Sequence, residues 1–422
     1  MKKSLILSSL MLVVFLHPAC NNKETILSPE IEQFIISQYT NMLEVADDLT
    51  KIPRRIDENG ALVTTGIYSW TSGFFAGSLW YIYELSGDEK WKEEAIKWTE
   101  TLDTIQYWSG NHDVGFMINC SYGNGLRLTG NEAYKPVLVQ TAESLIKRYN
   151  PHAKSLESWD YRKAWDGKTE WFFPVIIDNM MNLELLFEAS KLSGDKRFEE
   201  IALQHAQTTM KNHYRDDYSS YHVVDYDTLT GEVLDQATCQ GFVDESSWAR
   251  GQAWGLYGLV TCYRYTMDKQ YLSFAEHVAD YIITHPNLPE DMVPYWDFNV
   301  VDPVLTPEWD YDPSAFKEIP RDASAAAIIC SALLELCKYS DQSGERYFDA
   351  ATKILNSLAS PHYLALEGTN RYFILNHSVG SIPHGVEIDV PLVYADYYFL
   401  EALLRHSKLD KSELQVFRNN AL

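Results

Sequence analysis

Basic residues are few for a chain of this length. The 422 residues include 35 Lys and Arg against 59 Asp and Glu, which gives a formal net charge of −24. This deficit argues against nucleic acid or an anionic membrane surface as a partner, because both attract basic proteins. It does not exclude a small anionic substrate, because a pocket needs only a few local cations.

Cysteine is also scarce, with six residues in the whole chain and no CxxC pair. Cys330 and Cys337 fall in an apolar stretch with helical character. Buried thiols are therefore expected rather than a disulfide framework or a zinc site.

Several familiar catalytic motifs are absent. The chain has no HExxH, no P-loop, no GxGxxG that opens a helix and no GxSxG elbow. His112 directly precedes Asp113, which is not a metal-ligand spacing, and Asp225-x-Asp227 is only a weak calcium signal. We expect no catalytic metal and no other cofactor.

The first twenty residues have the pattern of a targeting segment. Lys2 and Lys3 precede an apolar run from 5 to 16, and small residues lead into Cys20. This pattern resembles a bacterial lipoprotein signal, in which the cysteine carries the lipid; an ordinary secretory signal with a chance cysteine is the alternative. The expected location is the cell envelope on the periplasmic side, with the lipid as the sole membrane contact. No other apolar run is long and charge-free enough to span a membrane.

A short motif recurs along the chain and predicts helical hairpins. It reads ELSGDEKW at 84–91, RLTGNEAY at 127–134 and KLSGDKRF at 191–198, with weaker copies at 265–271 and 339–348. In each copy the Gly ends one helix, the Asp or Asn caps the next, and the aromatic residue packs the hairpin against its neighbour.

Each motif is preceded by an apolar helix rich in small residues and followed by a more charged, amphipathic one. Five such hairpins, a helix starting at Ser28-Pro29 and a last one at 390–406 make twelve helices. Inner and outer helices that alternate in this way predict an all-α fold, an (α/α)6 toroid; a superhelical array of helix pairs is the alternative. The expected organisation is a signal at 1–20 and a single catalytic domain at 21–422, with strand-like pieces such as 219–234 on one rim.

The stretch PVIIDNMMNLELLFEAS at 174–190 is apolar on nearly every face, yet it contains Asp178. A buried charge costs several kcal/mol unless it is paired or protonated, so Asp178 either braces a neighbouring helix or is catalytic. The toroid would place Asp113 at the start of the adjacent inner helix. Two such carboxylates can have separated pKa values, which suits acid/base chemistry on a sugar.

Tryptophans flank the same loops and favour a carbohydrate ligand, although core packing explains any single one of them. They are Trp70, Trp159, Trp165, Trp171, Trp248 and Trp254.

Five segments resemble the unsaturated glucuronyl hydrolases of glycoside hydrolase family 88. They are NHDVGF (111–116), WFFPVIIDNMMNLELL (171–186), YHVVDYDTLTGEV (221–233), TCQGFVDESSWARGQAWGLYG (238–258) and VYADYYFLEALL (393–404). The resemblance runs from about residue 30 to 405 and implies the same (α/α)6 fold. The related unsaturated rhamnogalacturonyl hydrolases usually have RGNGW where this chain has RGQAW at 250–254, which favours the glycosaminoglycan branch. Two competing hypotheses are a sugar epimerase and a non-catalytic glycan-binding lipoprotein.

The resemblance implies removal of a 4,5-unsaturated uronic acid from the non-reducing end of oligosaccharides made by polysaccharide lyases. A proton is added to carbon 4 and water to carbon 5 of the vinyl ether, and the resulting hemiketal collapses. By motif match Asp178 is the acid/base. Asp113 is the second carboxylate, which holds the sugar and raises the pKa of Asp178.

The same match assigns substrate-binding positions. His222 and Gln240 lie beside the substrate, and Ser378 and Ser381 belong to the loop that meets the uronate carboxylate. The residues assigned to the wall around the uronic acid are Trp248, Arg250 and Trp254. Either Trp159 or Trp165 matches a further tryptophan expected before Asp178. The oligomeric state is left open.

Overall fold

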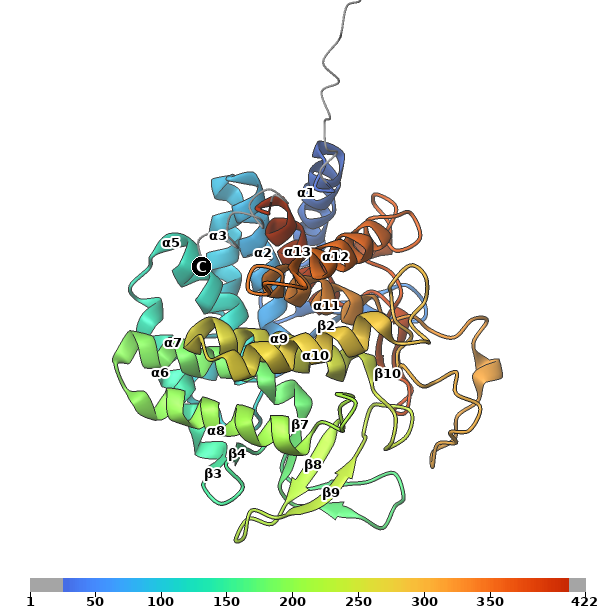
Figure 1. Ribbon diagram of the computed structural model, residues 1–422. Coiled ribbons are helices and arrows are strands. Elements are labelled where there is room, and N and C mark those ends of the chain that lie inside the picture. The colour runs from blue at the N-terminus through green and yellow to red at the C-terminus, as the bar shows by residue number, and fades with distance from the viewer. Residues whose placement is uncertain (1–25, 410–422) are drawn as a thin grey trace, which may run out of the picture.

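The computed structural model describes residues 26–409, and the predicted signal segment with Cys20 lies outside them. Figure 1 shows the helices of the described part of the chain, and six inner helical segments among them form a ring, each packed against the next. They are α2 (Ser72–Ser86), α4 to α5 (Val114–Ile118, π-helix η2 Asn119–Gly123, Asn124–Thr129), η4 with α7 (Ile177–Asn182, Leu183–Ser193), α9 (Ala249–Thr266), α11 (Ala323–Leu336) and α13 (Val393–Ser407). The outer helices are α1 (Pro29–Val45), α3 (Glu89–Glu100), α6 (Tyr134–Leu145), α8 (Lys196–Asn212), α10 (Lys269–Thr284) and α12 (Gly344–Leu358).

The inner ring is closed. α13, the last inner helix, packs against both α11 and the first inner helix, α2. A superhelical array would leave its first and last helices apart. The structure therefore confirms the all-α (α/α)6 toroid.

The hairpin turns have the capping geometry that the repeated motif predicts. Gly87 and Gly194 end α2 and α7 in the left-handed conformation, with φ of 67° and 78°. The carboxylates of Asp88 and Asp195 then accept backbone N–H groups in the first turns of α3 and α8. In the fourth hairpin Met267 takes the left-handed position, with φ 56°. Local capping thus sets these reversals of the chain. The weaker copy at 339–348 lacks this geometry, since α11 ends at Cys337 in the right-handed conformation and the side chain of Ser343 does not cap α12.

Inner and outer helices differ in burial as their sequences predict. Every residue of α11 from Ala323 to Leu336 is buried. In α12 only one face is buried, including Tyr347, Ala351, Ile354 and Leu358. A helix covered on all sides tolerates apolar residues at every position, whereas an outer helix needs a single apolar stripe. None of the helices within 26–409 is long and apolar enough to cross a membrane.

The stretch around Asp178 differs from the predicted continuous helix. Pro174–Ile176 is strand β7, which pairs with β8 through Val175 and Val224. A 3-10 turn, η4, follows, and the α-helix begins only at Leu183. The β-branched residues Val175 and Ile176 suit this ladder. Asp178 consequently lies on a tight turn above the inner helix.

Short strands gather where the inner helices begin. The set is β1 (Ile52–Ile56), β2 (Leu62–Thr65), β3 (Tyr149–Asn150), β4 (Ser155–Leu156), β5 (Arg162–Lys163), β6 (Glu170–Trp171), β7 (Pro174–Ile176), β8 (Val223–Tyr226), β9 (Val233–Ala237), β10 (Ser378–Ser381) and β11 (Val386–Val390). Strands β7, β8 and β9 form one antiparallel sheet, which includes the predicted strand region at 219–234. Further short 3-10 segments are η1 (Asp103–Tyr107), η3 (Ile146–Arg148), η5 (Pro313–Ala315) and η6 (Asn370–Tyr372).

All five cysteines of the described region are buried and unpaired, as expected. They are Cys120, Cys239, Cys262, Cys330 and Cys337.

Candidate active site

A cavity of about 490 Å³ opens at the end of the toroid where the inner helices begin. Asp113, Asp178, Gln240, Arg250 and Ser381, all predicted from the sequence, contribute to its wall. The other lining residues are Arg54, Trp70, His112, Trp159, Arg162, Ile176, Cys239, Gly380, His384, Val386 and Glu387. The structure thus brings both carboxylates and a ring of polar and aromatic side chains together.

The two carboxylates are neighbours because two inner elements approach very closely. Asp113 precedes the first turn of α4, and Asp178 lies in the first turn of η4. The side chain of Asn182 joins these elements by accepting the Phe116 N–H at 3.1 Å. At Gly115 a Cβ atom would lie 2.3 Å from Asn182 Oδ1, so only glycine permits this approach.

Both carboxyl groups hold a proton more strongly than a free carboxyl does. Burial raises the pKa of Asp178 from 3.8 to about 7, although the nearby charge of Arg250 opposes the shift. Burial, with the charge of Asp178 as the second cause, raises the pKa of Asp113 from 3.8 to about 8. Near neutral pH the pair can therefore supply an acid and a base in the same cavity.

The two carboxyl groups interact and titrate as a pair. Burial raises the pKa of both, the charge of Asp178 adds to the rise at Asp113, and the charge of Arg250 favours the ionised form of Asp178. That the charge of Asp113 in turn holds the proton on Asp178 stays a prediction.

His222 presents a fixed N–H to Asp178. Its Nδ1 accepts the backbone N–H groups of Cys239 and Gln240 at 3.0 and 3.2 Å, which places the proton of the neutral ring on Nε2. Nε2 lies 3.7 Å from Asp178 Oδ2. Burial, reinforced by the charge of Arg250, lowers the pKa of His222 well below 6.5, so the ring stays neutral.

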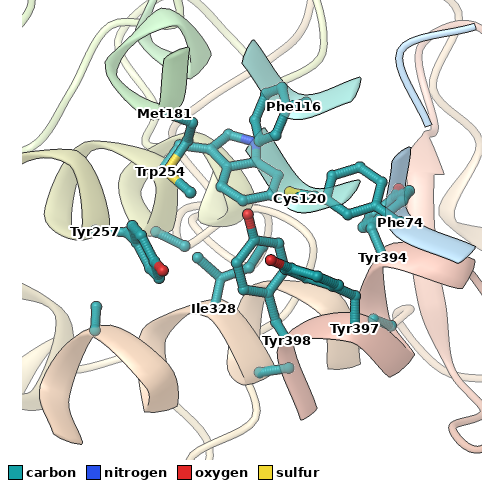
Figure 2. Packing of buried hydrophobic residues seen from close by; sticks show 14 of the residues in the cluster. Phe74, Phe116, Cys120, Met181, Trp254, Tyr257, Ile328, Tyr394, Tyr397 and Tyr398 are labelled. Atoms are coloured by element: carbon teal, nitrogen blue, oxygen red, sulfur yellow. The ribbon is translucent and has the colours of Figure 1, made fainter. Parts of the chain in front are cut away.

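Both tryptophans predicted for the wall, Trp248 and Trp254, lie behind the cavity surface. Trp254 is fully buried in the aromatic layer below the site, where it packs against Phe116 and Tyr398 (Figure 2). Its indole N–H lies close enough to Asp178 to lower the pKa of that carboxyl. Trp248, 3 % exposed, lies between the His222 ring and the Arg250 guanidinium. Both rings therefore support the polar residues that line the cavity.

Both terminal nitrogens of Arg250 donate within the protein. Nη1 lies 3.0 Å from Asp322 Oδ2 and also donates to the Val379 carbonyl, while Nη2 donates to Gly380 O at 2.6 Å and to Gln240 Oε1 at 3.3 Å. Asp322 is the N-cap of α11, so one guanidinium joins the start of α9, the start of α11 and strand β10. These bonds position the three elements; Arg250 also lines the cavity, and its Nε has no hydrogen-bond partner within residues 26–409, so its contact with the uronic acid stays a prediction.

Replacing Arg250 by Lys is expected to lower kcat/KM by about tenfold or more, because an ammonium group cannot make this planar set of bonds. A matched control is Arg321→Lys, since Arg321 also pairs with an aspartate and a carbonyl, Asp291 and Val293 O, but does not line the cavity. Steady-state kinetics on both variants are the measurement. Equal values for Arg250→Lys and wild type would contradict the positioning role.

The predicted serines occupy different environments. Ser381 lines the cavity and its Oγ lies 2.6 Å from His384 Nδ1. Ser378 is completely buried, and its Oγ is among the buried polar atoms of residues 26–409 without a hydrogen-bond partner. Of the two candidate tryptophans, Trp159 lines the cavity, whereas Trp165 packs against the His384 ring from outside it.

Sequence reasoning missed four charged or titratable residues of the wall: Arg54, Arg162, His384 and Glu387. They come from three separate loops or strands, and none lies in a helix. The β10–β11 hairpin, which contains two of them, has left-handed backbone at Glu387 and Asp389, with φ of 57° and 54°. No local pattern in the sequence marks these positions, because the segments that contain them come together only at the rim of the folded toroid.

Asp178 Oδ2 and His222 Nε2, which lie 3.7 Å apart, are both among the buried polar atoms without a hydrogen-bond partner within residues 26–409. In the same range no group of three or more His, Cys, Asp or Glu side chains is placed to hold a metal ion.

A helical toroid with an acid and a base buried at one mouth, surrounded by aromatic and polar side chains, is the arrangement of a carbohydrate-active hydrolase. A scan of protein-family models gives no match to this chain. An unsaturated glucuronyl hydrolase of Formosa agariphila is 44 % identical over 418 residues, which cover 97 % of this chain and 99 % of the relative. The chain belongs to the unsaturated glucuronyl hydrolase family, which confirms the resemblance.

Solved structures agree with this assignment. A crystal structure of an unsaturated glucuronyl hydrolase specific for heparin is 45 % identical, with a TM-score of 0.81, and covers 90 % of this chain and 97 % of that one. An Asp-to-Asn mutant of the unsaturated glucuronyl hydrolase from Streptococcus agalactiae, complexed with dGlcA-GalNAc6S, is 29 % identical. Its TM-score is 0.71, and the match covers 92 % of this chain and 94 % of that one.

Proposed function

We propose that this protein removes the 4,5-unsaturated uronic acid from the non-reducing end of glycosaminoglycan oligosaccharides left by polysaccharide lyases. Membership of the family supports the reaction class. The observation that carries the proposal is the pair of buried carboxyl groups with pKa values of about 7 and 8 at the cavity floor. Such a pair can supply a proton donor at neutral pH, and hydration of a vinyl ether needs no nucleophilic side chain.

In the proposed reaction Asp178 gives its proton to carbon 4 of the vinyl ether. It then takes a proton from the water that adds at carbon 5, so the carboxyl group ends the step in its starting form. The hemiketal formed at carbon 5 collapses and releases the remaining sugar.

The surrounding residues support this proton transfer. The Nε2–H of neutral His222, 3.7 Å from Asp178 Oδ2, is placed to donate to the substrate or to the ionised carboxylate. Burial raises the pKa of Asp113, and its protonated form can hold a sugar hydroxyl both as donor and as acceptor.

The test is loss of the double-bond absorbance of lyase-made disaccharides of the heparin, chondroitin and hyaluronan types. A hydrolase abolishes the absorbance, whereas a glycan-binding protein leaves it intact. Loss of signal with at least one disaccharide is expected, and heparin-type disaccharides are favoured because the 45 % identical structure is that of an enzyme specific for heparin. Unchanged absorbance across the whole panel would overturn the proposed function.

We also propose that Cys20 is lipidated and anchors the protein at the periplasmic side of the bacterial envelope. The support is the lysine pair, the apolar run and the small residues before Cys20. Cys20→Ala is expected to move the protein from the membrane fraction to the soluble fraction with unchanged specific activity. Fractionation of cells followed by the disaccharide assay measures both, and an unaltered membrane fraction would contradict lipidation.

A further inference from the structure

The three arginines that line the cavity differ in their partners. Arg250 is paired with Asp322, and Arg54 Nε lies 2.5 Å from Glu387 Oε1. Arg162 has no ion pair with any residue between 26 and 409; its guanidinium lies over the Trp159 ring, 4.4 Å from the centroid. Of the three cations, Arg162 is the one whose charge is not balanced by an ion pair within residues 26–409.

Arg162 is placed at the mouth of the cavity. It is exposed, whereas Asp113 and Asp178 are both 9 % exposed. It lies on β5, where its neighbour Lys163 projects to the opposite face, as successive residues of a strand do, and reaches Glu170 at 4.0 Å. The charge of Arg162 also lowers the pKa of His384, although burial is the larger cause.

The position of Asp178 fixes the direction in which the substrate enters the cavity. The unsaturated sugar must lie at the floor, where Asp178 can reach its carbon 4, so the sugar to be released points toward the mouth. A guanidinium seated on an aromatic ring has a fixed plane and offers a fork of N–H donors, which matches the oxygens of a sulfate group.

We propose that Arg162, supported by Trp159, recognises a sulfate group on the sugar directly following the unsaturated uronic acid. This inference rests on the proposed function and specifies its substrate class: disaccharides sulfated on the leaving sugar are preferred over the unsulfated ones. In this arrangement Arg54 and Arg250 keep their ion pairs with Glu387 and Asp322, and Arg162 alone contacts the sulfate.

The experiment compares kcat/KM for two unsaturated disaccharides that differ only in sulfate on the second sugar. Arg162→Gln is expected to lower kcat/KM for the sulfated compound about fivefold, mainly through KM, which is the scale of an exposed ion pair. The value for the unsulfated compound should stay unchanged. Arg162→Lys keeps the positive charge but lacks the forked guanidinium, so its kcat/KM for the sulfated compound should lie between those of wild type and Arg162→Gln. Lys163→Gln is the matched control, because it removes a cation from the same strand on the other face.

Each other outcome is decisive. An equal loss with both disaccharides would mean that Arg162 binds the uronate carboxylate, and it would overturn the assignment to the leaving sugar. An unchanged ratio in Arg162→Gln, or the same change in Lys163→Gln, would also overturn it. If wild-type protein hydrolyses neither compound nor any other disaccharide of the panel, the proposed function itself fails and this inference fails with it.

Discussion

Asp178→Asn should turn over unsaturated disaccharides at least about 10²-fold more slowly than wild type, the usual scale of general acid/base catalysis. The amide keeps the shape of the side chain and can still donate a hydrogen bond, but it cannot give a proton to carbon 4 and take one back from water. The measurement is the initial rate of double-bond absorbance loss at pH 6 and at pH 7, with substrate binding followed separately by calorimetry. Binding should persist.

The control for this variant is its melting curve at pH 8. The carboxyl of Asp178 loses its proton near pH 3.8 when unfolded and near 7 when folded, so ionisation costs stability as pH rises across that interval. Asn has no such cost, and Asp178→Asn should melt at or above the wild-type temperature at pH 8. Wild-type turnover, or inactivity accompanied by unfolding, would refute the acid/base role.

Asp113→Asn should lower kcat/KM by about tenfold or more, because a hydrogen bond made by a carboxyl group to the sugar is lost or misoriented. The same variant tests how the two carboxyls are coupled. Asp178 must be protonated to react, so wild-type activity is present below pH 7 and is lost as pH rises through about 7. Asp113→Asn should shift this alkaline limb to lower pH, because Asp178 loses a neighbouring carboxylate whose charge disfavours its ionisation.

The pH–rate profiles of wild type and Asp113→Asn provide the measurement, and His205→Gln, a buried substitution outside the cavity, controls for general damage. A shift of the alkaline limb to lower pH in Asp113→Asn would show that the charge of Asp113 holds the proton on Asp178. An unchanged kcat/KM would show that Asp113 does not contact the substrate.

Much of the fold could be predicted from local signals. The Ser/Thr-Gly-Asp/Asn motif specifies a helix end and the next helix cap within a few residues, and Gly87 with Asp88 has this geometry in the structure. The apolar character of 323–336 predicts an inner helix, because only complete burial suits such a sequence. The secondary structure of the stretch at 174–182 could not be predicted from local signals. Its apolar residues suit a buried helix and a buried strand equally, and pairing with β8 decided between them.

The candidate site was predictable to the extent that its residues lie in recognisable segments. Asp113 and Asp178 stand out as carboxylates in apolar surroundings, and the structure places both at the cavity floor. The resemblance assigned Trp254 to the cavity wall, but the ring lies in the aromatic layer underneath, because a helix position alone does not say how deep a ring is buried. The catalytic and binding roles of these residues remain predictions.

The sequence by itself determined the twelve helices, their alternation and the two carboxylates, since capping and hydrophobic periodicity act between residues close in the chain. Only the tertiary structure decided which side chains line the cavity. Arg54 on β1, Arg162 on β5 and His384 in the β10–β11 turn are far apart in sequence and meet only when the ring closes. It also decided that Arg250 is paired with Asp322 while Arg162 is free, because ion pairs at a rim depend on the distance between elements and not on the residues beside them.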